Sequence, residues 1–440
     1  MSMKLQFAWV LLILGVPSVA LSQQPDTPID LSRALEIVRA VSVDVQDAEL
    51  SVQVAERELR TRKLAWTPDL NARAALSGNV GRTFVSSEGA NLTRPVASGD
   101  TSLVSSVRLW AGGERLADLR ASRADIEFSE ADLAQTRLDS SAAVIIALLR
   151  LGDAEARLTV SEADLATALD LEARITAFVD AGARTRADLA FQHAAVARSR
   201  TSVLAARQAR IDAQLSLVEL LRLDPAIDWV FTPPESAPSM VGDALSLTEK
   251  AIAQLPSMAA AQADIGATTA RIGSALSGYL PTLDLRIGIS TAWISSSSTD
   301  LGSQLAERAN ASAIFTLNVP IWDRGLTRES VERAEVSQRR AQLRMSALHE
   351  RVAIEVRSLL ASRQTALAGI EAAQLQHSAA AEALSIINER YDAGIASLFE
   401  LSEARSVLIA AENELITART GALAVDFDLA LLSGQLPAKD

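Results

Sequence analysis

The feature that most constrains this chain is an internal repeat, with a period of about 213 residues, which indicates a duplicated structural unit. A proline, an arginine, a tryptophan and a glycine recur in the same order in both halves of the sequence. The spacing within each pair is constant to within one position: Pro68 and Pro281, Arg73 and Arg286, Trp110 and Trp322, Gly182 and Gly394. The sequence therefore predicts two units, 23–240 and 241–440.

Both units show the same order of hydrophobic patterns. A helical pattern leads into two strands of alternating apolar and polar residues, and a long helix, a glycine and a shorter helix follow. In the first unit we expect a helix, strands at about 69–84 and 101–110, helices at 114–180 and 185–223, and an irregular connector. In the second unit we expect a helix, strands at about 282–294 and 311–322, and helices at 326–392 and 397–433.

The long helices are too extended for one thick globular core. Neither 114–180 nor 326–392 contains proline, and a helix of that length spans about 100 Å. Hydrophobic residues make up 49% of the chain but aromatic residues only 4%, which suits long helices packed closely side by side. The helix before the strands can stack end to end with the shorter helix, which places Gly182 and Gly394 at the far tip.

The alternating strands have one apolar and one polar face, and each is long enough to cross a bilayer at a tilt. Four strands cannot close a barrel that holds water. Three chains would supply twelve strands and a closed barrel without a lipid-exposed edge, which membrane insertion requires. The alternative is a small soluble sheet that caps a helical rod. We therefore predict a mainly α-helical fold with membrane β-strands.

Aromatic residues mark the ends of these strands. Amphipathic rings collect at membrane–water interfaces, although an ordinary sheet could use them for packing. Four lie where the strands adjoin the helices: Trp66, Trp110, Tyr279 and Trp322. Trp293 lies about twelve residues into its strand, and we expect it near the outer rim. Arg73 and Arg286 fall on the polar face at equal heights, where they either set selectivity or keep a wet lumen soluble.

The N-terminus has the pattern of a secretory signal at 1–22. Lys4 precedes an apolar run, 7–16, that is shorter than the roughly 20 residues of a spanning helix, and small residues allow cleavage after Ala20 or Ser22. A membrane anchor is the alternative. The chain has no cysteine, which excludes thiolate chemistry and an N-terminal lipid anchor. The net charge of −12 argues against nucleic acid as a partner.

Catalysis is poorly supported by the sequence. The only three histidines, His193, His349 and His377, are isolated in helical segments. None lies in a metalloprotease, hydrolase or phosphate-binding motif. We therefore expect no enzyme, no metal site and no cofactor.

With these elements laid out, the chain resembles the TolC family of outer-membrane efflux proteins over about residues 28–436. The resemblance rests on the segments that follow the second strand of each unit, 109–113 and 321–325, and on the two glycine turns. It also rests on the segment 391–401, YDAGIASLFEL. The family implies a homotrimer in the outer membrane, in which a twelve-stranded barrel is continued by a periplasmic barrel of helices. It also implies a periplasmic adaptor (membrane-fusion) protein and an inner-membrane transporter of the RND, MFS or ABC type as partners.

The resemblance also assigns roles at the periplasmic mouth. Glu400 and Glu403 match the acidic residues that narrow the aperture, where an acidic ring would favour cations. Asp188 matches a carboxylate that can hydrogen-bond across to the tyrosine at Tyr391 and hold the mouth shut. The chain departs from the family at Ala396, where a basic residue can provide a second contact. The alternative for both glutamates is an ordinary solvated helix face.

The resemblance makes the turns at Gly182 and Gly394 the contact site for the adaptor's helical hairpin, beyond their role as helix-ending turns. We expect a channel that exports substrates from the periplasm or from a tripartite pump, with drug or small-molecule efflux favoured. The alternative is the outer-membrane component of a type I protein secretion system. A soluble periplasmic coiled-coil adaptor is a distant alternative, because it would lack two equal halves with spanning strands.

Overall fold

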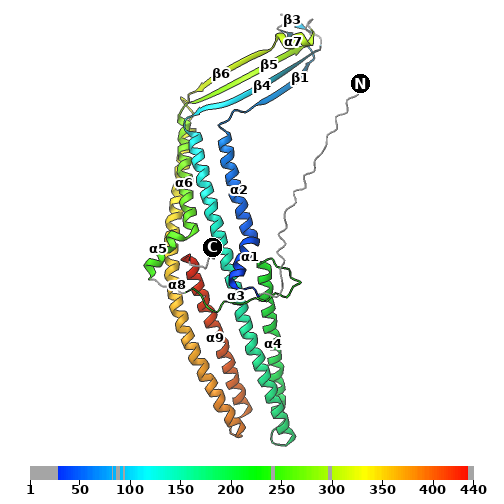
Figure 1. Cartoon of the computed structure of the whole chain (residues 1–440), viewed down its shortest axis with the longest axis vertical. Helices are drawn as coiled ribbons and strands as arrows, with labels where there is room; N and C mark the ends of the chain where they lie inside the picture. The colour runs from blue at the N-terminus through cyan, green and yellow to red at the C-terminus, as the bar shows by residue number, and fades with distance from the viewer. Residues whose placement is uncertain are drawn as a thin grey trace, which may run out of the picture.

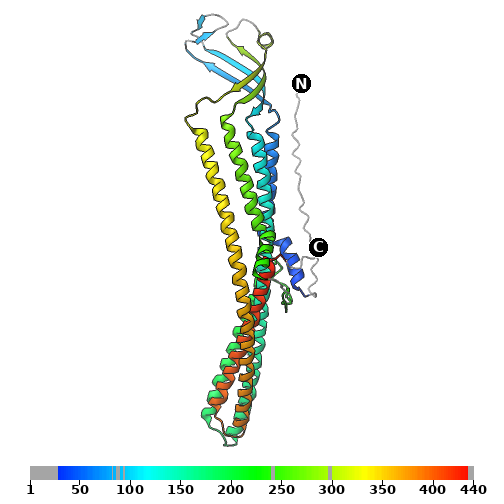
Figure 2. The same ribbon diagram turned by 90° about the vertical axis from the view of Figure 1, so that its left-hand side faces the viewer.

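A computed structural model describes residues 28–81, 83–85, 90–92, 95–238, 243–295 and 300–434. The predicted signal at 1–22 lies outside these residues. Figures 1 and 2 show an elongated molecule, with a sheet at one end and two helical hairpin turns side by side at the other. Long helices connect the two ends.

The two longest helices have 67 residues each: α3 (Glu114–Asp180) and α8 (Leu326–Asp392). They run from the sheet to the opposite end of the molecule. Each is followed by an antiparallel helix of 35 residues, α4 (Arg186–Leu220) or α9 (Leu398–Leu432). All four run without proline, so nothing in them removes a backbone donor. The two halves of the chain thus build the same long helical hairpin.

Both long helices end in a left-handed glycine. Gly182 has a φ of 75° and Gly394 a φ of 73°, a region that favours glycine because it has no Cβ. The next N–H in each turn reaches back to the preceding helix, from Ala183 to the Phe178 carbonyl and from Ile395 to the Arg390 carbonyl, at 2.8 Å in both cases. This is the Schellman pattern, and it reverses the chain at the tip.

The sequence predicts one helix before the strands of each unit, but the structure has a broken one. The pieces are α1 (Leu31–Val41) and α2 (Val43–Leu64), and α5 (Ala244–Gln254), α6 (Pro256–Leu276) and a 3-10 turn, η1 (Ser277–Tyr279). Leu255 is extended because it precedes Pro256. Ser42 breaks the first unit at the position of the repeat equivalent to Leu255, and its hydroxyl accepts the Val45 N–H at 3.5 Å.

The helices form a single curved layer (Figures 1 and 2). Near the sheet, the order across the layer is α2, α3, α6 and α8; in the far half, α4 packs on α3 and α9 packs between α3 and α8. The shorter helices therefore continue the lines of α2 and α6, which is the end-to-end stacking predicted from the sequence. Apolar cores lie at mid-length, where Leu148 and Leu217 are fully buried near Trp229, and Phe427 fills a second cluster.

The sheet is antiparallel, and its order is β1-β4-β5-β6. Its strands are β1 (Asn71–Asn79), β4 (Val96–Ala111), β5 (Thr282–Ile294) and β6 (Asn310–Asn318). A separate two-stranded hairpin is formed by β2 (Thr83–Val85) and β3 (Ala90–Leu92). Among the described residues, β1 and β6 each have one edge without a partner strand.

Three strand predictions need correction. The strand expected at 69–84 ends at Asn79, because Gly81 adopts a φ of 118° and a new hairpin begins. The strand expected at 101–110 begins at Val96, since β1 pairs with it as far as Val96 and β5 as far as Ser98. The strand expected at 311–322 ends at Asn318, which pairs with Thr282, the first residue of its neighbour β5. The loop before it also contains a short helix that the sequence did not predict, α7 (Leu301–Glu307).

Candidate channel wall and mouth

The register of the sheet separates an apolar face from a polar one. Directly paired residues point to the same side of an antiparallel sheet. The apolar face is formed by Ala72, Ala74, Leu76, Leu103, Val107, Leu283, Leu285, Ile287, Ile289, Ala311, Ala313, Phe315 and Leu317. The opposite face carries most of the polar residues: Asn71, Arg73, Asp100, Ser102, Ser106, Arg108, Asp284, Arg286, Ser290, Asn310, Ser312 and Thr316.

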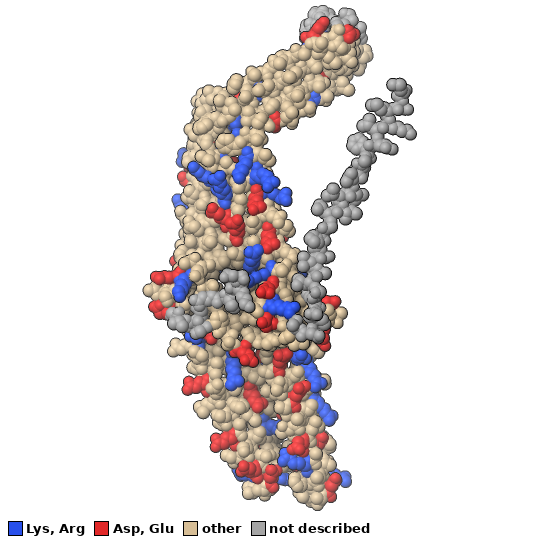
Figure 3. Space-filling model, in the orientation of Figure 1, with Lys and Arg blue, Asp and Glu red and all other residues tan. Residues whose placement is uncertain are grey.

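No described element covers the apolar face. Leu76 is 82% exposed, Phe315 65% and Ile289 57%. The face of the sheet visible in Figure 3 carries few charged side chains, whereas the helices below it carry many of both signs. A continuous apolar face of this size needs an apolar environment. None of the helices in the described part of the chain is long and apolar enough to cross a bilayer.

A β-bulge positions one of the aromatic residues. The pairing of β4 with β5 shifts between Arg108 and Trp110, so that Trp110 lies opposite Leu283. A bulge re-aims a side chain in this way, and it adds Trp110 to the apolar face. At the other end of the sheet, Trp293 covers Gly99, where a Cβ atom would collide with its ring.

The remaining aromatic residues that the sequence predicts at the membrane rim lie at the junction of sheet and helices. Trp66, Tyr279 and Trp322 are each at least half exposed. The Arg115 guanidinium lies 5.5 Å from the centre of the Trp66 ring, so one of these rings already has a cationic partner within the chain.

Charged residues join the polar face to the helices at the same junction. Arg108 pairs with Asp284 across the strands at 3.0 Å and with Glu114 of α3 at 3.6 Å. Arg73 and Arg286 both lie on the polar face, as predicted from the alternation. They do not lie at equal heights along the sheet, contrary to the prediction from the sequence. Arg73 pairs with Ser102 and Arg286 with Ser106, and these two serines are about 13 Å apart along β4. The offset comes from the register of strand pairing, which the repeat in the sequence does not by itself determine.

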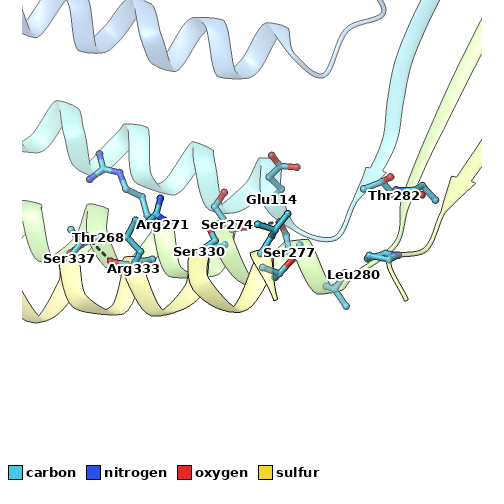
Figure 4. Close-up of a pocket in the computed structure, with 17 residues that line it drawn as sticks. Glu114, Thr268, Arg271, Ser274, Ser277, Leu280, Thr282, Ser330, Arg333 and Ser337 are labelled. Atoms are coloured by element: carbon cyan, nitrogen blue, oxygen red, sulfur yellow. Dashed lines mark hydrogen bonds between the residues drawn. The ribbon is translucent and has the colours of Figure 1, made fainter. Parts of the chain in front are cut away.

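A pocket of about 750 Å³ lies beside this junction, between α6 and α8 (Figure 4). Two of its polar side chains bind α3, and the hydroxyls of Thr268, Ser277 and Ser337 donate to backbone carbonyls one turn earlier in the chain. Arg271 pairs with Asp125 at 2.6 Å, and the Ser274 hydroxyl donates to Asp118 at 2.7 Å. These contacts hold α6 against α3. No group of metal-ligating side chains occurs among the residues that the structure describes.

At the opposite end, two of the predicted mouth residues close capping boxes. Asp188 accepts hydrogen bonds from the backbone and hydroxyl of Thr185, at 3.1 and 2.9 Å. Glu400 accepts the same pair from Ser397, at 2.7 and 2.9 Å. Asp188 and Glu400 occupy equivalent positions of the repeat, so the two capping boxes are copies of one feature. The Ser397 donors lower the pKa of Glu400 below its usual value.

The other two predicted mouth residues differ in environment. Glu403 is exposed and makes no hydrogen bond or ion pair within the described residues. Tyr391 is only 3% exposed, and its hydroxyl is buried without a hydrogen-bond partner in the described part of the chain. The expected bond from Asp188 to Tyr391 is therefore not made within one chain, where the carboxylate is engaged by Thr185.

Tyr391 joins the two hairpins through apolar contacts. Its cluster combines Leu171 and Ile175 of α3 with Leu398 and Leu401 of α9. The Arg184 guanidinium, in the turn after α3, lies 4.7 Å from the centre of the Tyr391 ring. Arg184 was not identified from the sequence, although it is the repeat equivalent of Ala396, the position where the family's basic residue is missing.

A buried ion pair further along the hairpins also escaped the sequence analysis. Asp164 of α3 lies 2.6 Å from Arg405 of α9, and their side chains are 12% and 14% exposed. The Arg405 guanidinium also donates to the Asp164 carbonyl, and the Ser199 hydroxyl of α4 donates to the Asp164 carboxylate at 2.5 Å. Three helices thus meet at one carboxylate.

The comparison with known proteins identifies the family. The chain matches the model of the outer membrane efflux protein family over residues 34–221 and 247–435, one match in each unit. The chain therefore belongs to this family and is an outer-membrane export channel. The sequence predictions of fold class, outer-membrane location and resemblance to the TolC family are confirmed. The family consists of channels and not of enzymes.

Two relatives in sequence are distant, whereas a solved structure is close in fold. Protein CyaE of Bordetella pertussis is 27% identical over 333 residues, which cover 72% of this chain and 68% of that protein. The outer membrane efflux protein BepC of Brucella suis is 22% identical over 260 residues, 59% of this chain and 55% of its own length. The structure of CusC superimposes with a TM-score of 0.79 at 20% identity, covering 92% of this chain and 91% of CusC.

Proposed function

We propose that three copies of this chain form one export duct, in which their twelve strands close a membrane barrel and their helices form a tunnel below it. The observation that carries this proposal is the sheet itself. Its four strands leave an open edge on β1 and on β6, and its apolar face is not covered by any described element. An open sheet edge is not tolerated in lipid, so the edges must pair with further copies.

The polar face then lines the barrel, and the exposed carboxylates narrow the mouth. Arg73 and Arg286 would face the lumen near the membrane, while Glu400 and Glu403 would form acidic rings at the far tip. Three copies of each glutamate in a small aperture concentrate negative potential, which attracts cations. The aromatic residues at the ends of the sheet would lie at the two membrane interfaces.

The tip turns at Gly182 and Gly394 would receive a periplasmic adaptor, which links the duct to an inner-membrane transporter. Both glycines lie in exposed turns at the end farthest from the sheet. Small-molecule efflux is the favoured cargo class, supported by the family description and by the name of the relative BepC. Type I protein secretion uses the same kind of duct and is the alternative.

Deletion of the gene tests the cargo class. Cells without the protein should accumulate a fluorescent efflux substrate, and a plasmid copy should restore its export. Unchanged accumulation, together with loss of a protein from the culture medium, would favour the secretion alternative.

The glutamates at the mouth should set ion selectivity. We expect the double variant Glu400→Gln, Glu403→Gln to lose most of the cation preference of the channel in planar bilayers. Glutamine can keep the capping box, so the fold of the mouth should persist. Glu56→Ala removes an exposed carboxylate from α2, at the other end of the helices, and serves as the control. Equal reversal potentials for all three proteins would rule out the assignment.

The pH dependence follows from the lowered pKa of Glu400. A carboxyl group with a lowered pKa stays charged as the pH falls below its usual value of 4.5, and loses its charge only as the pH passes through the lowered pKa. In the Glu403→Gln variant, where Glu400 is the remaining glutamate of the proposed aperture, cation selectivity should therefore persist below pH 4.5. Selectivity that disappears at or above that pH would contradict the structure.

A further inference from the structure

We propose that neighbouring copies join as the two repeats of one chain join, with β6 and α8 of one copy on β1 and α2 of the next. This inference rests on the proposed duct, and it specifies the strand register and the side chains at each junction between copies. Within one chain, β4 and α3 of the first repeat contact β5 and α6 of the second. The equivalents of these four elements lie at the two edges of the described sheet and helical layer.

Strand register is the same in the two repeats. β1 pairs with β4 so that Asn71 lies opposite Val104. In the second repeat, β5 pairs with β6 so that Asp284 lies opposite Thr316. Asp284 follows Asn71 by 213 residues and Thr316 follows Val104 by 212, which is the spacing of the repeat. Equivalent strands therefore pair at equivalent residues.

The pairing of β4 with β5 has an equivalent only between copies. The counterpart of β4 is β6 and that of β5 is β1, and these two strands lie at opposite edges of the sheet. In the pairing within the chain, Leu103 lies opposite Ile289. The corresponding pair between copies is Phe315 opposite Leu76 of the next copy.

This register keeps both faces of the sheet continuous across the junction. It places Leu317 opposite Ala74 of the next copy on the apolar face, and Asn318 opposite Arg73 of the next copy on the polar face. A slip of one residue would exchange the two faces of one strand. The register taken from β4 and β5 is therefore also one that the alternation of β6 and β1 permits.

The helices below the sheet show the same relation. Ala267 is 1% exposed, on the face of α6 that contacts α3, and Ala124 of α3 is 8% exposed. Their equivalents are Val54 of α2 and Val336 of α8, which are 66% and 47% exposed. A second copy would bring these two apolar side chains together, as α3 and α6 bring the alanines together.

Small residues at the junction within the chain correspond to charged residues at the junction between copies. A Cβ atom on Gly273 of α6 would lie 3.5 Å from the Ala117 Cβ atom of α3, so the two helices are in close contact there. The equivalents are Arg60 of α2 and Glu329 of α8. Both are exposed, and neither makes an ion pair within the described residues. Their opposite charges predict an ion pair between copies.

The turn between the sheet and the long helix shows that the junction between copies is the wider one. Gly112 has a φ of 58°, and a Cβ atom there would lie 2.7 Å from the Leu280 Cβ atom. Its equivalent, Arg324, has a φ of 61° but carries a side chain. An exact copy of the contact would make Arg324 collide with Thr67 of the next copy, the equivalent of Leu280. Long charged side chains therefore fill a wider space between copies.

Disulfide cross-linking tests the register, because the chain has no cysteine of its own. In the variant Ala74→Cys, Leu317→Cys, the cysteines lie at opposite edges of one sheet and can meet only between copies. Directly opposite residues have Cα atoms about 4.5–5.5 Å apart, which a disulfide can bridge. After oxidation in outer-membrane fractions, we expect most of the denatured protein to migrate as a covalent trimer, and reductant to return it to single chains.

The matched control moves one cysteine by two residues along the same face. In Leu76→Cys, Leu317→Cys the Cα atoms would lie about 7–8 Å apart, beyond the reach of a disulfide, so the yield of covalent trimer should fall about tenfold. A yield from this control that equals or exceeds that of the first variant would overturn the register.

Charge reversal tests the junction between the helices. We expect Arg60→Glu to lower the temperature at which the trimer dissociates, because it places two carboxylates together. The double variant Arg60→Glu, Glu329→Arg should recover most of this loss, since α2 and α8 lie at opposite edges of one chain and only a contact between copies couples the two residues. A double variant no more heat-resistant than Arg60→Glu would refute the ion pair.

These outcomes are distinct from failure of the proposed function. A cysteine-free wild-type protein that forms no trimer would refute the duct, and this docking with it. A wild-type trimer in which the pair at 74 and 317 gives no cross-link would overturn the docking alone.

Discussion

Arginine in place of Ile289 is expected to destabilise the membrane-embedded assembly by about 2–4 kcal/mol per chain, the cost of a cation on the lipid face near the bilayer midplane. Ile289 lies in the middle of β5, on the apolar face, where it pairs with Leu103 and Ala311. The control is Ser290→Arg, one residue along the strand. Ser290 faces the other side, opposite Ser102, and an arginine there would enter the polar lumen.

Heat resistance of the assembled protein, followed by gel migration after incubation at rising temperature, measures both variants. We expect Ile289→Arg to dissociate at a clearly lower temperature, or to fail to assemble, and Ser290→Arg to resemble the wild type. Equal behaviour of the two variants would mean that the faces of the sheet have been assigned wrongly.

The substitution Arg405→Met is expected to have the second large effect on the stability of the protein. It leaves the Asp164 carboxylate buried without its cation, which is expected to cost about 3–5 kcal/mol. The double variant Asp164→Leu, Arg405→Met should recover most of this loss, because an apolar pair of similar volume often replaces a buried ion pair without penalty. The control is Arg419→Met on α9, since Arg419 is exposed and has no ion pair in the described part of the chain.

Thermal unfolding followed by circular dichroism measures this series. The expected order of stability places the control beside the wild type, the double variant slightly below and Arg405→Met lowest. If Arg405→Met were as stable as Arg419→Met, the ion pair would not hold α9 to α3 as the structure indicates.

The long helices could be predicted to the residue, because local signals define their ends. Gly113 and Gly325 precede α3 and α8, and both helices end before a left-handed glycine. The two breaks in the helices that precede the strands were not equally visible in the sequence. Pro256 indicates the break between α5 and α6. Ser42 is a residue that a helix tolerates, so only its equivalence to Leu255 in the repeat indicates the break between α1 and α2.

The strand ends depend on neighbours that the sequence does not reveal. β6 ends at Asn318 because its partner begins at Thr282, and β4 begins early because β1 pairs with it as far as Val96 and β5 as far as Ser98. The bulge that turns Trp110 to the apolar face is likewise a property of pairing. Alternation alone therefore identified the faces but not the lengths of the strands.

The sequence predicted which residues lie at the mouth but not the contacts that they make. Resemblance placed Asp188 and Glu400 at the mouth, yet their engagement in capping boxes was readable from Thr185 and Ser397 three residues earlier. The Asp164–Arg405 pair joins residues that are far apart in sequence, and no local pattern announces it. Aligning the repeats would have shown that Arg184 occupies the position of Ala396.

The number of chains in the assembly tests the central claim most directly. Native mass spectrometry of the protein extracted from the outer membrane in mild detergent measures this number. The open edges of β1 and β6 and the apolar face that no described element covers predict a single species of three chains. A stable, folded species of one chain would contradict the proposed duct.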